Sequence, residues 1–158
     1  MELGRMKILS FGVPCYNSET YMKKCIDSLL VGGDDIEIII VDDGSKDGTA
    51  AIADEYAAAY PDIVKAVHQE NGGHGEAVNT GLKNASGLYY KVVDSDDWLD
   101  EDSLKKVIEV LKRFAQNKKR VDLMICNYVY EHVEDQTSKA IRYANVLPEG
   151  EVLGWNKV

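Results

Sequence analysis

The stretch LYYKVVDSDDWLDED, residues 88–102, shows most directly how this chain folds. Its first half is apolar, β-branched and aromatic, which predicts a β-strand, and the strand ends abruptly at Asp94, Asp96 and Asp97. Close carboxylates repel one another, so such a cluster needs either open water or a bound cation. Mg²⁺ takes oxygen ligands and is commonly held by one or two carboxylates plus substrate phosphates. Asp-x-Asp at a strand end is therefore typical of a site for a metal and a diphosphate.

The acids that come next have a purely structural interpretation. Residues 100–102 precede an apolar series at helical spacing that begins at Leu104, so we expect them to cap a helix and to complement its dipole. Asp94 and Asp96 lie too early for that role. Taken alone, the motif DSDD is a weak signal, because short acidic motifs arise often by chance.

The composition is that of an ordinary globular domain. The chain has 158 residues, of which 45% are hydrophobic and 28% charged. Acidic residues outnumber basic ones by 27 to 18, and the net charge of −9 disfavours nucleic acid as a partner. Five basic residues lie near the end of a helix that we expect to reach Phe114. They have two interpretations, a solvated surface or contact with an anionic membrane. Its members are Lys112, Arg113, Lys118, Lys119 and Arg120.

The cysteines and the absence of apolar segments indicate the compartment. Cys15, Cys25 and Cys126 are odd in number and lack metal-type spacing, which favours structural thiols in a reducing environment. The N-terminal residues show no signal-peptide pattern, and no run reaches the ~18 apolar residues of a membrane span. We therefore expect a cytoplasmic protein, with peripheral association at the cytoplasmic face of the membrane as an additional expectation.

Apolar runs alternate with helical patterns along the chain. Strands are expected at 8–13, 36–41, 63–67, 88–93 and 121–130. Helices are expected from residue 17 or 18 to about 30, from about 49 to 60, around 78–85, and from about 104 to 114. Beyond residue 131 the periodicity fades. The alternation predicts an α/β fold with a parallel sheet, because parallel neighbours need a crossover connection.

Polar segments follow each of the first four expected strands. They lie at 14–17, 42–45, 71–73 and 94–97. Ligands of a doubly wound sheet bind outside the carboxyl ends of its strands. We therefore expect these four segments to gather on one rim of the sheet.

These segments resemble the ordered motifs of family 2 glycosyltransferases of the GT-A fold. The similar motifs are VPCYNSE at 13–19, IVDDGSKDGT at 40–49, NGG at 71–73, NTGL at 79–82 and DSDD at 94–97. Individually each motif is weak to moderate, but their shared order and spacing make a strong signal over about residues 6–115. The resemblance implies a Rossmann-like three-layer α/β/α nucleotide-sugar-binding fold with a mostly parallel sheet.

The resemblance also implies which residues bind a nucleotide-sugar donor. Segment 14–17 and Asp43 match the part of the family pocket that holds the base and ribose, and Asp94, Asp96 and Asp97 match the motif that carries Mn²⁺ or Mg²⁺ against the diphosphate. The donor-binding candidates are Pro14, Tyr16, Asn17, Asp43, Gly73, His74, Asp94 and Ser95.

Structural roles remain open for several of these candidates. Asp43, like Asp42 before it, could end a strand and cap a turn, and Gly73 could provide only a tight loop and a helix entry. His74 could be an exposed loop residue without a ligand, and Tyr16 could serve ordinary packing.

The implied activity is inverting transfer of a sugar from a nucleoside-diphosphate sugar to a glycan or lipid-linked acceptor, as in cell-wall or polysaccharide biosynthesis. Inverting members use a carboxylate base well beyond the Asp-x-Asp motif, and no residue of this chain is assigned that role. We expect residues 1–158 to form a single GT-A-like domain that ends before the acceptor and catalytic-base region. Many family members also have an arginine where this chain has Val78, so no basic donor contact is expected from that position.

Two other classes of function remain. The first is a module that binds a nucleotide sugar without chemistry. The second is another metal-dependent nucleotidyltransferase or phosphotransferase, which is disfavoured because the chain lacks a Walker loop and has Pro14 and Cys15, not an aspartate nucleophile, after its first strand.

Overall fold

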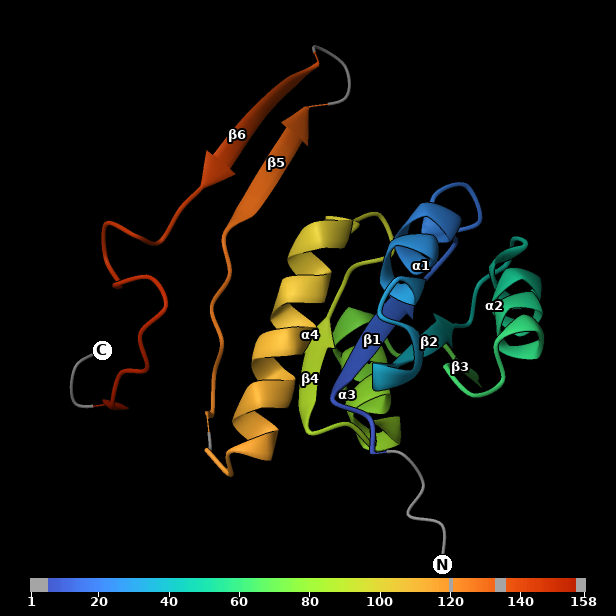
Figure 1. The fold of residues 1–158 in the computed structure, drawn as a ribbon. Helices are drawn as coiled ribbons and strands as arrows, with labels where there is room; N and C mark the ends of the chain where they lie inside the picture. The colour runs from blue at the N-terminus through green and yellow to red at the C-terminus, as the bar shows by residue number, and fades with distance from the viewer. Residues whose placement is uncertain (1–5, 120, 133–135, 156–158) are drawn as a thin grey trace, which may run out of the picture. The chain divides into compact units, whose positions relative to one another are not determined.

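The computed structural model describes residues 6–119, 121–132 and 136–155. Contacts within the chain form two compact units, Met1–Arg113 and Phe114–Val158. In the described part of the first unit, strands alternate with helices (Figure 1). The strands are β1 (Leu9–Cys15), β2 (Ile36–Asp43), β3 (Val64–Gln69) and β4 (Tyr89–Val92). The helices are α1 (Met22–Leu30), the 3-10 helix η1 (Gly33–Asp35), α2 (Thr49–Ala59), α3 (His74–Asn84) and α4 (Glu101–Gln116).

The four strands form one parallel sheet in the order β3-β2-β1-β4. Gly12 of β1 pairs with Ile39 of β2 on one side and with Val92 of β4 on the other. The chain therefore winds outward from β1 to β3 and then crosses back to place β4 beside β1. This arrangement confirms the parallel α/β sheet predicted from the alternation of strands and helices.

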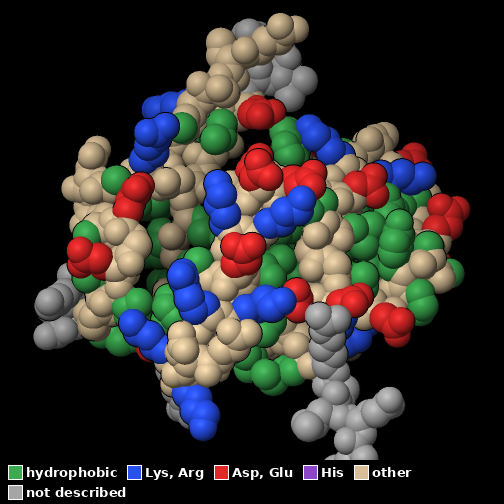
Figure 2. All heavy atoms as spheres, in the orientation of Figure 1, with side chains coloured by type: hydrophobic (Ala, Val, Ile, Leu, Met, Phe, Trp, Pro, Cys, Tyr) green, Lys and Arg blue, Asp and Glu red, His purple; other side chains and the backbone are tan. Residues whose placement is uncertain are grey.

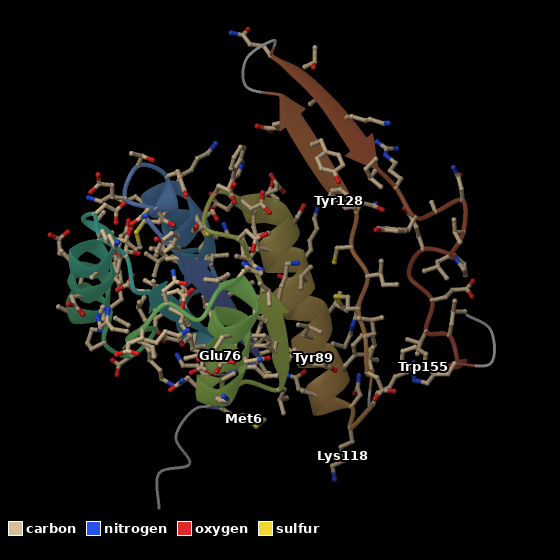
Figure 3. The ribbon with its side chains drawn as sticks, turned by 180° about the vertical axis from the view of Figure 1, so that it is seen from behind. Met6, Glu76, Tyr89, Lys118, Tyr128 and Trp155 are labelled. Atoms are coloured by element: carbon tan, nitrogen blue, oxygen red, sulfur yellow. The ribbon has the colours of Figure 1, made fainter. Side chains whose placement is uncertain are left out.

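The core lies on both faces of the sheet. Every residue of β1 and β2 is buried, as expected of strands covered on both sides. Ala77 of α3 packs with Ile39 and Val41 of β2 in one buried cluster. Figures 1 and 3 show α3 on the opposite side of the sheet from α1. The first unit is thus a three-layer α/β/α structure.

Two glycines bring α3 close to β1. A Cβ atom added at Gly81 would lie 3.4 Å from the Cα of Gly12, and one added at Gly12 would lie 1.9 Å from the hydroxyl oxygen of Tyr90. That hydroxyl donates a hydrogen bond to the carbonyl oxygen of Val78 at 3.1 Å. The contact fixes α3 against the centre of the sheet.

A buried carboxylate joins the amino ends of the strands. Glu37 of β2 is 2% exposed. Its Oε1 accepts hydrogen bonds from the hydroxyl of Ser10 at 2.6 Å, from the backbone N–H of Gly87 at 3.1 Å, and from both the N–H and the hydroxyl of Ser86. Its Oε2 lies 2.8 Å from Lys65 Nζ. Burial by itself raises the pKa of Glu37, but these partners outweigh it and lower the pKa to about 2.

Asp100 caps α4 as predicted, and Glu101 and Asp102 lie in the first turn of the helix. The backbone N–H of Ser103 donates to Asp100 Oδ1 at 2.9 Å, and Leu104 N donates to the Asp100 carbonyl oxygen. The buried residues of α4 are Leu104, Ile108 and Leu111, which recur at helical spacing.

The second unit corrects the sequence prediction for its strands. Residues 121–130 were expected to form one strand, but the structure has β5 at Tyr128–His132, paired antiparallel with β6 at Thr137–Ile141. Residues 121 and 123–127 lack strand structure, and Leu123 and Ile125 are exposed. An apolar run becomes a strand only where a neighbouring strand takes its backbone hydrogen bonds, and local pattern does not supply that partner. The strand β6 also lies where periodicity was expected to fade.

The surface and the helices show two further properties. The face in Figure 2 mixes acidic, basic and apolar side chains. Within the described ranges, none of the helices has both the length and the apolar character needed to cross a bilayer.

Candidate functional site

A cleft of about 290 Å³ lies at the carboxyl edge of the parallel sheet. The walls are formed by the ends of β1 and β2, the loops that follow β1 and β3, and the first turns of α3. The lining residues are Pro14, Cys15, Tyr16, Asp43, Asn71, Gly73, His74 and Ala77. Pro14, Tyr16, Asp43, Gly73 and His74 are among the donor-binding candidates predicted from the sequence. The structure therefore brings residues from three separate motifs into one cavity.

Asp43 is the buried carboxylate of the cleft, with 3% of the residue exposed. Its Oδ1 accepts hydrogen bonds from Gln69 Nε2 at 2.7 Å and from Gly72 N at 2.8 Å, and its Oδ2 accepts one from Gly73 N at 2.9 Å. Burial by itself raises the pKa of Asp43, but these hydrogen bonds outweigh it and leave the pKa below its ordinary value. Asp43 is thus an ionised group that ties the loop after β3 to the end of β2.

The neighbouring Asp42 has the structural role that its position suggested. Its Oδ1 accepts a hydrogen bond from Ser45 N at 3.1 Å, and its Oδ2 lies 3.1 Å from His68 Nδ1. The other ring nitrogen of His68 lies 3.1 Å from Asp54 Oδ1. Hydrogen bonds with Asp42 and then Asp54 raise the pKa of His68, because an imidazole can donate to two carboxylates only when it is protonated.

Tyr16 and Asn17 follow β1 but have different surroundings. Tyr16 lines the cleft and is 48% exposed, so its ring can accept a further partner. Asn17 has a φ of 50° and directs its side chain to the loop after β2, where Oδ1 accepts a hydrogen bond from Lys46 N at 2.9 Å. Asn17 N also donates to Ser45 Oγ at 3.0 Å. Asn17 therefore joins two rim loops and lies outside the cleft lining.

Ser95 is buried beside the cleft and does not line it. Its hydroxyl oxygen lies 2.9 Å from that of Ser18, and both residues are buried. The backbone N–H of Ser18 donates to Thr49 Oγ1 at 2.7 Å. These contacts hold the turn after β4 against the loop after β1 and the start of α2.

His74 connects the cleft to the acidic turn. Gly73 precedes α3 with a φ of 85°, a conformation that favours glycine, and His74 is the first residue of the helix. The Nε2 atom of His74 lies 3.7 Å from Asp94 Oδ1, and the two side chains are 65% and 53% exposed. The carboxylate of Asp94 therefore lies beside a residue that lines the cleft.

The acidic turn after β4 presents three carboxylates at this rim. Asp94, Asp96 and Asp97 are exposed, and Asp97 N donates to the Asp94 carbonyl oxygen at 2.9 Å. Partial burial and the charges of Asp96 and Asp94 raise the pKa of Asp97, although Lys91 acts in the opposite direction. In the part of the chain that the structure describes, no group of three His, Cys, Asp or Glu side chains could by itself hold a metal ion. The turn instead suits a hard cation that takes its remaining ligands from phosphate and water.

Three lining residues, Cys15, Asn71 and Ala77, were not among the individual donor-binding candidates, although Cys15 lies in segment 14–17 and Asn71 in segment 71–73, both expected at this rim. Cys15 is 1% exposed, and burial raises its pKa to about 12, so the thiol stays protonated. Ala77 lines the cleft because α3 packs against the sheet. An alanine gives no local sign in the sequence that such a contact will form.

Comparisons with known proteins agree with this architecture. The family described as "Glycosyl transferase family 2" matches residues 10–142. EpsH of Bacillus subtilis (strain 168) is 38% identical over 167 aligned positions, which cover 95% of this chain and 46% of EpsH. The chain thus spans less than half the length of that relative.

Two solved structures share the fold. The crystal structure of S. aureus TarS 1-349 in complex with UDP has a TM-score of 0.60 and 32% identity, covering 68% of this chain and 33% of that one. The mannosyltransferase PcManGT from Pyrobaculum calidifontis in complex with GDP-Man and Mn²⁺ has a TM-score of 0.57 and 27% identity, covering 68% of this chain and 32% of that one.

Proposed function

This chain belongs to glycosyl transferase family 2, and we propose that it is the donor- and metal-binding part of an enzyme that transfers a sugar from a nucleoside-diphosphate sugar to a glycan or lipid-linked acceptor. The observation that carries the proposal is the cleft of about 290 Å³ at the carboxyl edge of the sheet, with Asp94 3.7 Å from the lining residue His74. TarS with UDP and PcManGT with GDP-Man and Mn²⁺ support a nucleotide sugar as the ligand class and a divalent cation as its companion.

In this proposal Tyr16 and Asp43 hold the nucleoside. The half-exposed ring of Tyr16 can pack against a base. A carboxylate has about four acceptor positions, and protein donors occupy three on Asp43. One position remains for a base N–H or a ribose hydroxyl. A ligand that contacts Asp43 would therefore meet an oriented, ionised acceptor that needs no rearrangement.

The metal is proposed to bind at Asp94, Asp96 and Asp97. When bound, Mn²⁺ or Mg²⁺ offsets negative charge on the departing nucleoside diphosphate. These carboxylates are exposed and crowd one another, so a cation would relieve repulsion that already exists in the folded chain.

Both compact units are proposed to belong to one glycosyltransferase domain. The family match runs from residue 10 to residue 142 and so crosses the boundary between Met1–Arg113 and Phe114–Val158. The acceptor contacts of the complete enzyme are not assigned to any residue of this chain.

The test is nucleotide binding by an Asp96→Ala variant. UDP and GDP are titrated calorimetrically into the wild-type chain with Mn²⁺ and again with EDTA. The wild type is expected to bind at least one diphosphate in a metal-dependent way, and Asp96→Ala is expected to weaken that binding about tenfold or more. Because Asp96 is exposed, its removal should leave the melting temperature unchanged within a few degrees.

The matched control is Asp62→Ala. Asp62 is an exposed aspartate just before β3, so its removal changes the net charge equally but at the amino edge of the sheet. Wild-type affinity in Asp96→Ala with Mn²⁺ present would contradict the proposed metal site. Diphosphate binding that ignores EDTA would contradict metal-assisted binding altogether.

A further inference from the structure

The cleft faces an electrostatic problem if its ligand is a nucleoside diphosphate. Asp43 is ionised at one end, and the carboxylates of Asp94, Asp96 and Asp97 lie at the rim. A diphosphate placed between them is repelled by both groups unless positive charge or N–H donors intervene. A cation held by the aspartates would offset charge at the acidic turn but not at Asp43.

Among the described residues that line the cleft, His74 is the side chain able to carry positive charge. Two lysines close to the acidic turn lie outside the cleft lining. Lys24 Nζ lies 2.9 Å from the centroid of the Trp98 ring, and Lys91, which acts on Asp97, is an exposed residue of β4 outside the cleft lining. The imidazole of His74 therefore stands between the nucleoside end of the cleft and the acidic turn.

The geometry leaves His74 available to a ligand. The 3.7 Å separation between Nε2 and Asp94 Oδ1 is within ion-pair distance but too long for a hydrogen bond, so the N–H of the ring is not committed to that carboxylate. The ring is also 65% exposed. Either protonation state of an imidazole presents at least one N–H to a phosphate oxygen.

The backbone before His74 is held in place by the buried carboxylate of the cleft. Asp43 accepts hydrogen bonds from Gly72 N at 2.8 Å and Gly73 N at 2.9 Å, the two residues immediately before His74. Gly73 then turns the chain into α3 with a positive φ. Asp43, which is proposed to contact the nucleoside, thus also positions His74, whose side chain would lie next to the diphosphate.

We propose that His74 binds the diphosphate of the donor and makes the site selective for nucleoside diphosphates over nucleosides. This inference rests on the proposed donor-binding function and adds a residue-level basis for phosphate recognition. Asp43 acts as a positioning residue for His74 through the two glycine N–H groups.

The experiment compares His74→Ala and His74→Arg with the wild-type chain, all with saturating Mn²⁺. UDP and GDP are titrated calorimetrically, and uridine and guanosine are measured by competition against the corresponding diphosphate. His74→Ala is expected to weaken diphosphate binding about tenfold and nucleoside binding less than threefold, whereas His74→Arg retains diphosphate affinity within about threefold. Lys83→Ala, which removes a positive charge from the other end of α3, is the matched control and should change neither.

Three results would overturn the inference. Equal losses of diphosphate and nucleoside affinity in His74→Ala would show that the residue shapes the cleft and does not recognise phosphate. Unchanged diphosphate affinity in His74→Ala would remove His74 from the site while leaving the donor-binding function standing. Failure of the wild-type chain to bind any diphosphate would overturn the donor-binding function and this inference with it.

Discussion

Replacing Glu37 by glutamine should destabilise the first unit in a pH-dependent way. Glutamine keeps the shape of the side chain and an oxygen for the donors on Ser10, Ser86 and Gly87. Its amide nitrogen would take the place of Oε2 and turn a donor toward Lys65 Nζ, which lies 2.8 Å from that oxygen in the native chain. The variant therefore loses a buried ion pair, and its amide N–H faces the ammonium group of Lys65 with no acceptor between them. The volume of the side chain stays almost the same.

The magnitude follows from the pKa of Glu37. Its folded-state value of about 2 lies below the ordinary 4.5. Each unit of difference corresponds to about 1.4 kcal/mol, so the ionised carboxylate contributes about 3 kcal/mol to the free energy of unfolding near pH 7. Because the folded pKa is depressed, this contribution is complete above pH ~4.5 and is lost as the pH falls toward ~2. At pH 3 the same relation leaves about 1.5 kcal/mol.

The assay is urea denaturation of the wild type and Glu37→Gln at pH 7, 5 and 3. The difference in unfolding free energy should be about 3 kcal/mol at pH 7 and pH 5 and about half of that at pH 3. Glu109→Gln on α4 is the control, because Glu109 is exposed and its replacement should cost less than about 0.5 kcal/mol. A difference below 1 kcal/mol at pH 7, or one that stays the same at pH 3, would refute the reasoning.

Two other substitutions probe contacts inside the first unit. Gly12→Ala would place a Cβ atom 1.9 Å from the hydroxyl oxygen of Tyr90. We therefore expect the free energy of unfolding, measured by urea denaturation, to fall by about 2 to 3 kcal/mol. A decrease below about 0.5 kcal/mol would contradict the close packing of α3 on β1. His68→Gln should lower the melting temperature slightly at pH 6 and hardly at pH 9. Folding raises the pKa of His68, so the stabilisation by this residue is present below its ordinary pKa of 6.5 and is lost as the pH rises through the folded-state pKa. With 42% of that side chain exposed, the effect should stay under about 1 kcal/mol, and an equal effect at both pH values would exclude the ionic contacts with Asp42 and Asp54 as its cause.

The sequence predicted the first unit well because its signals are local. Apolar runs separated by helical patterns require crossover connections, and crossovers place the carboxyl ends of parallel strands at one edge. The rim segments containing Pro14, Asp43, Gly73 and Asp94 could therefore be expected to meet, although they are far apart in the sequence. The cap at Asp100 was also predictable, because a cap and its helix are neighbours in the chain.

The tertiary structure decided which partner each polar side chain finds. Asp42 and Asp43 are adjacent in the sequence, and the fold places Asp43 in the cleft lining and pairs Asp42 with a histidine of β3. In the same way Asn17 and Ser95 carry the right chemistry for a ligand, yet the fold directs them to the loop after β2 and to Ser18.

The strand β2 shows most clearly what the sequence predicts and what only the fold decides, because it combines an apolar pattern with a buried glutamate. Periodicity along the chain determined that 36–41 is a buried strand of a parallel sheet, because burial on both faces selects a continuous apolar run. Only the folded chain determined that Glu37 can remain ionised there, because its partners Ser10, Lys65 and Ser86 lie 27, 28 and 49 residues away along the sequence. The strand β5 has the same explanation, since its position depends on pairing with β6. Local sequence determines the helices and the strands of the parallel sheet, whereas long-range hydrogen bonds and packing determine where β5 forms and which side chains meet in the cleft.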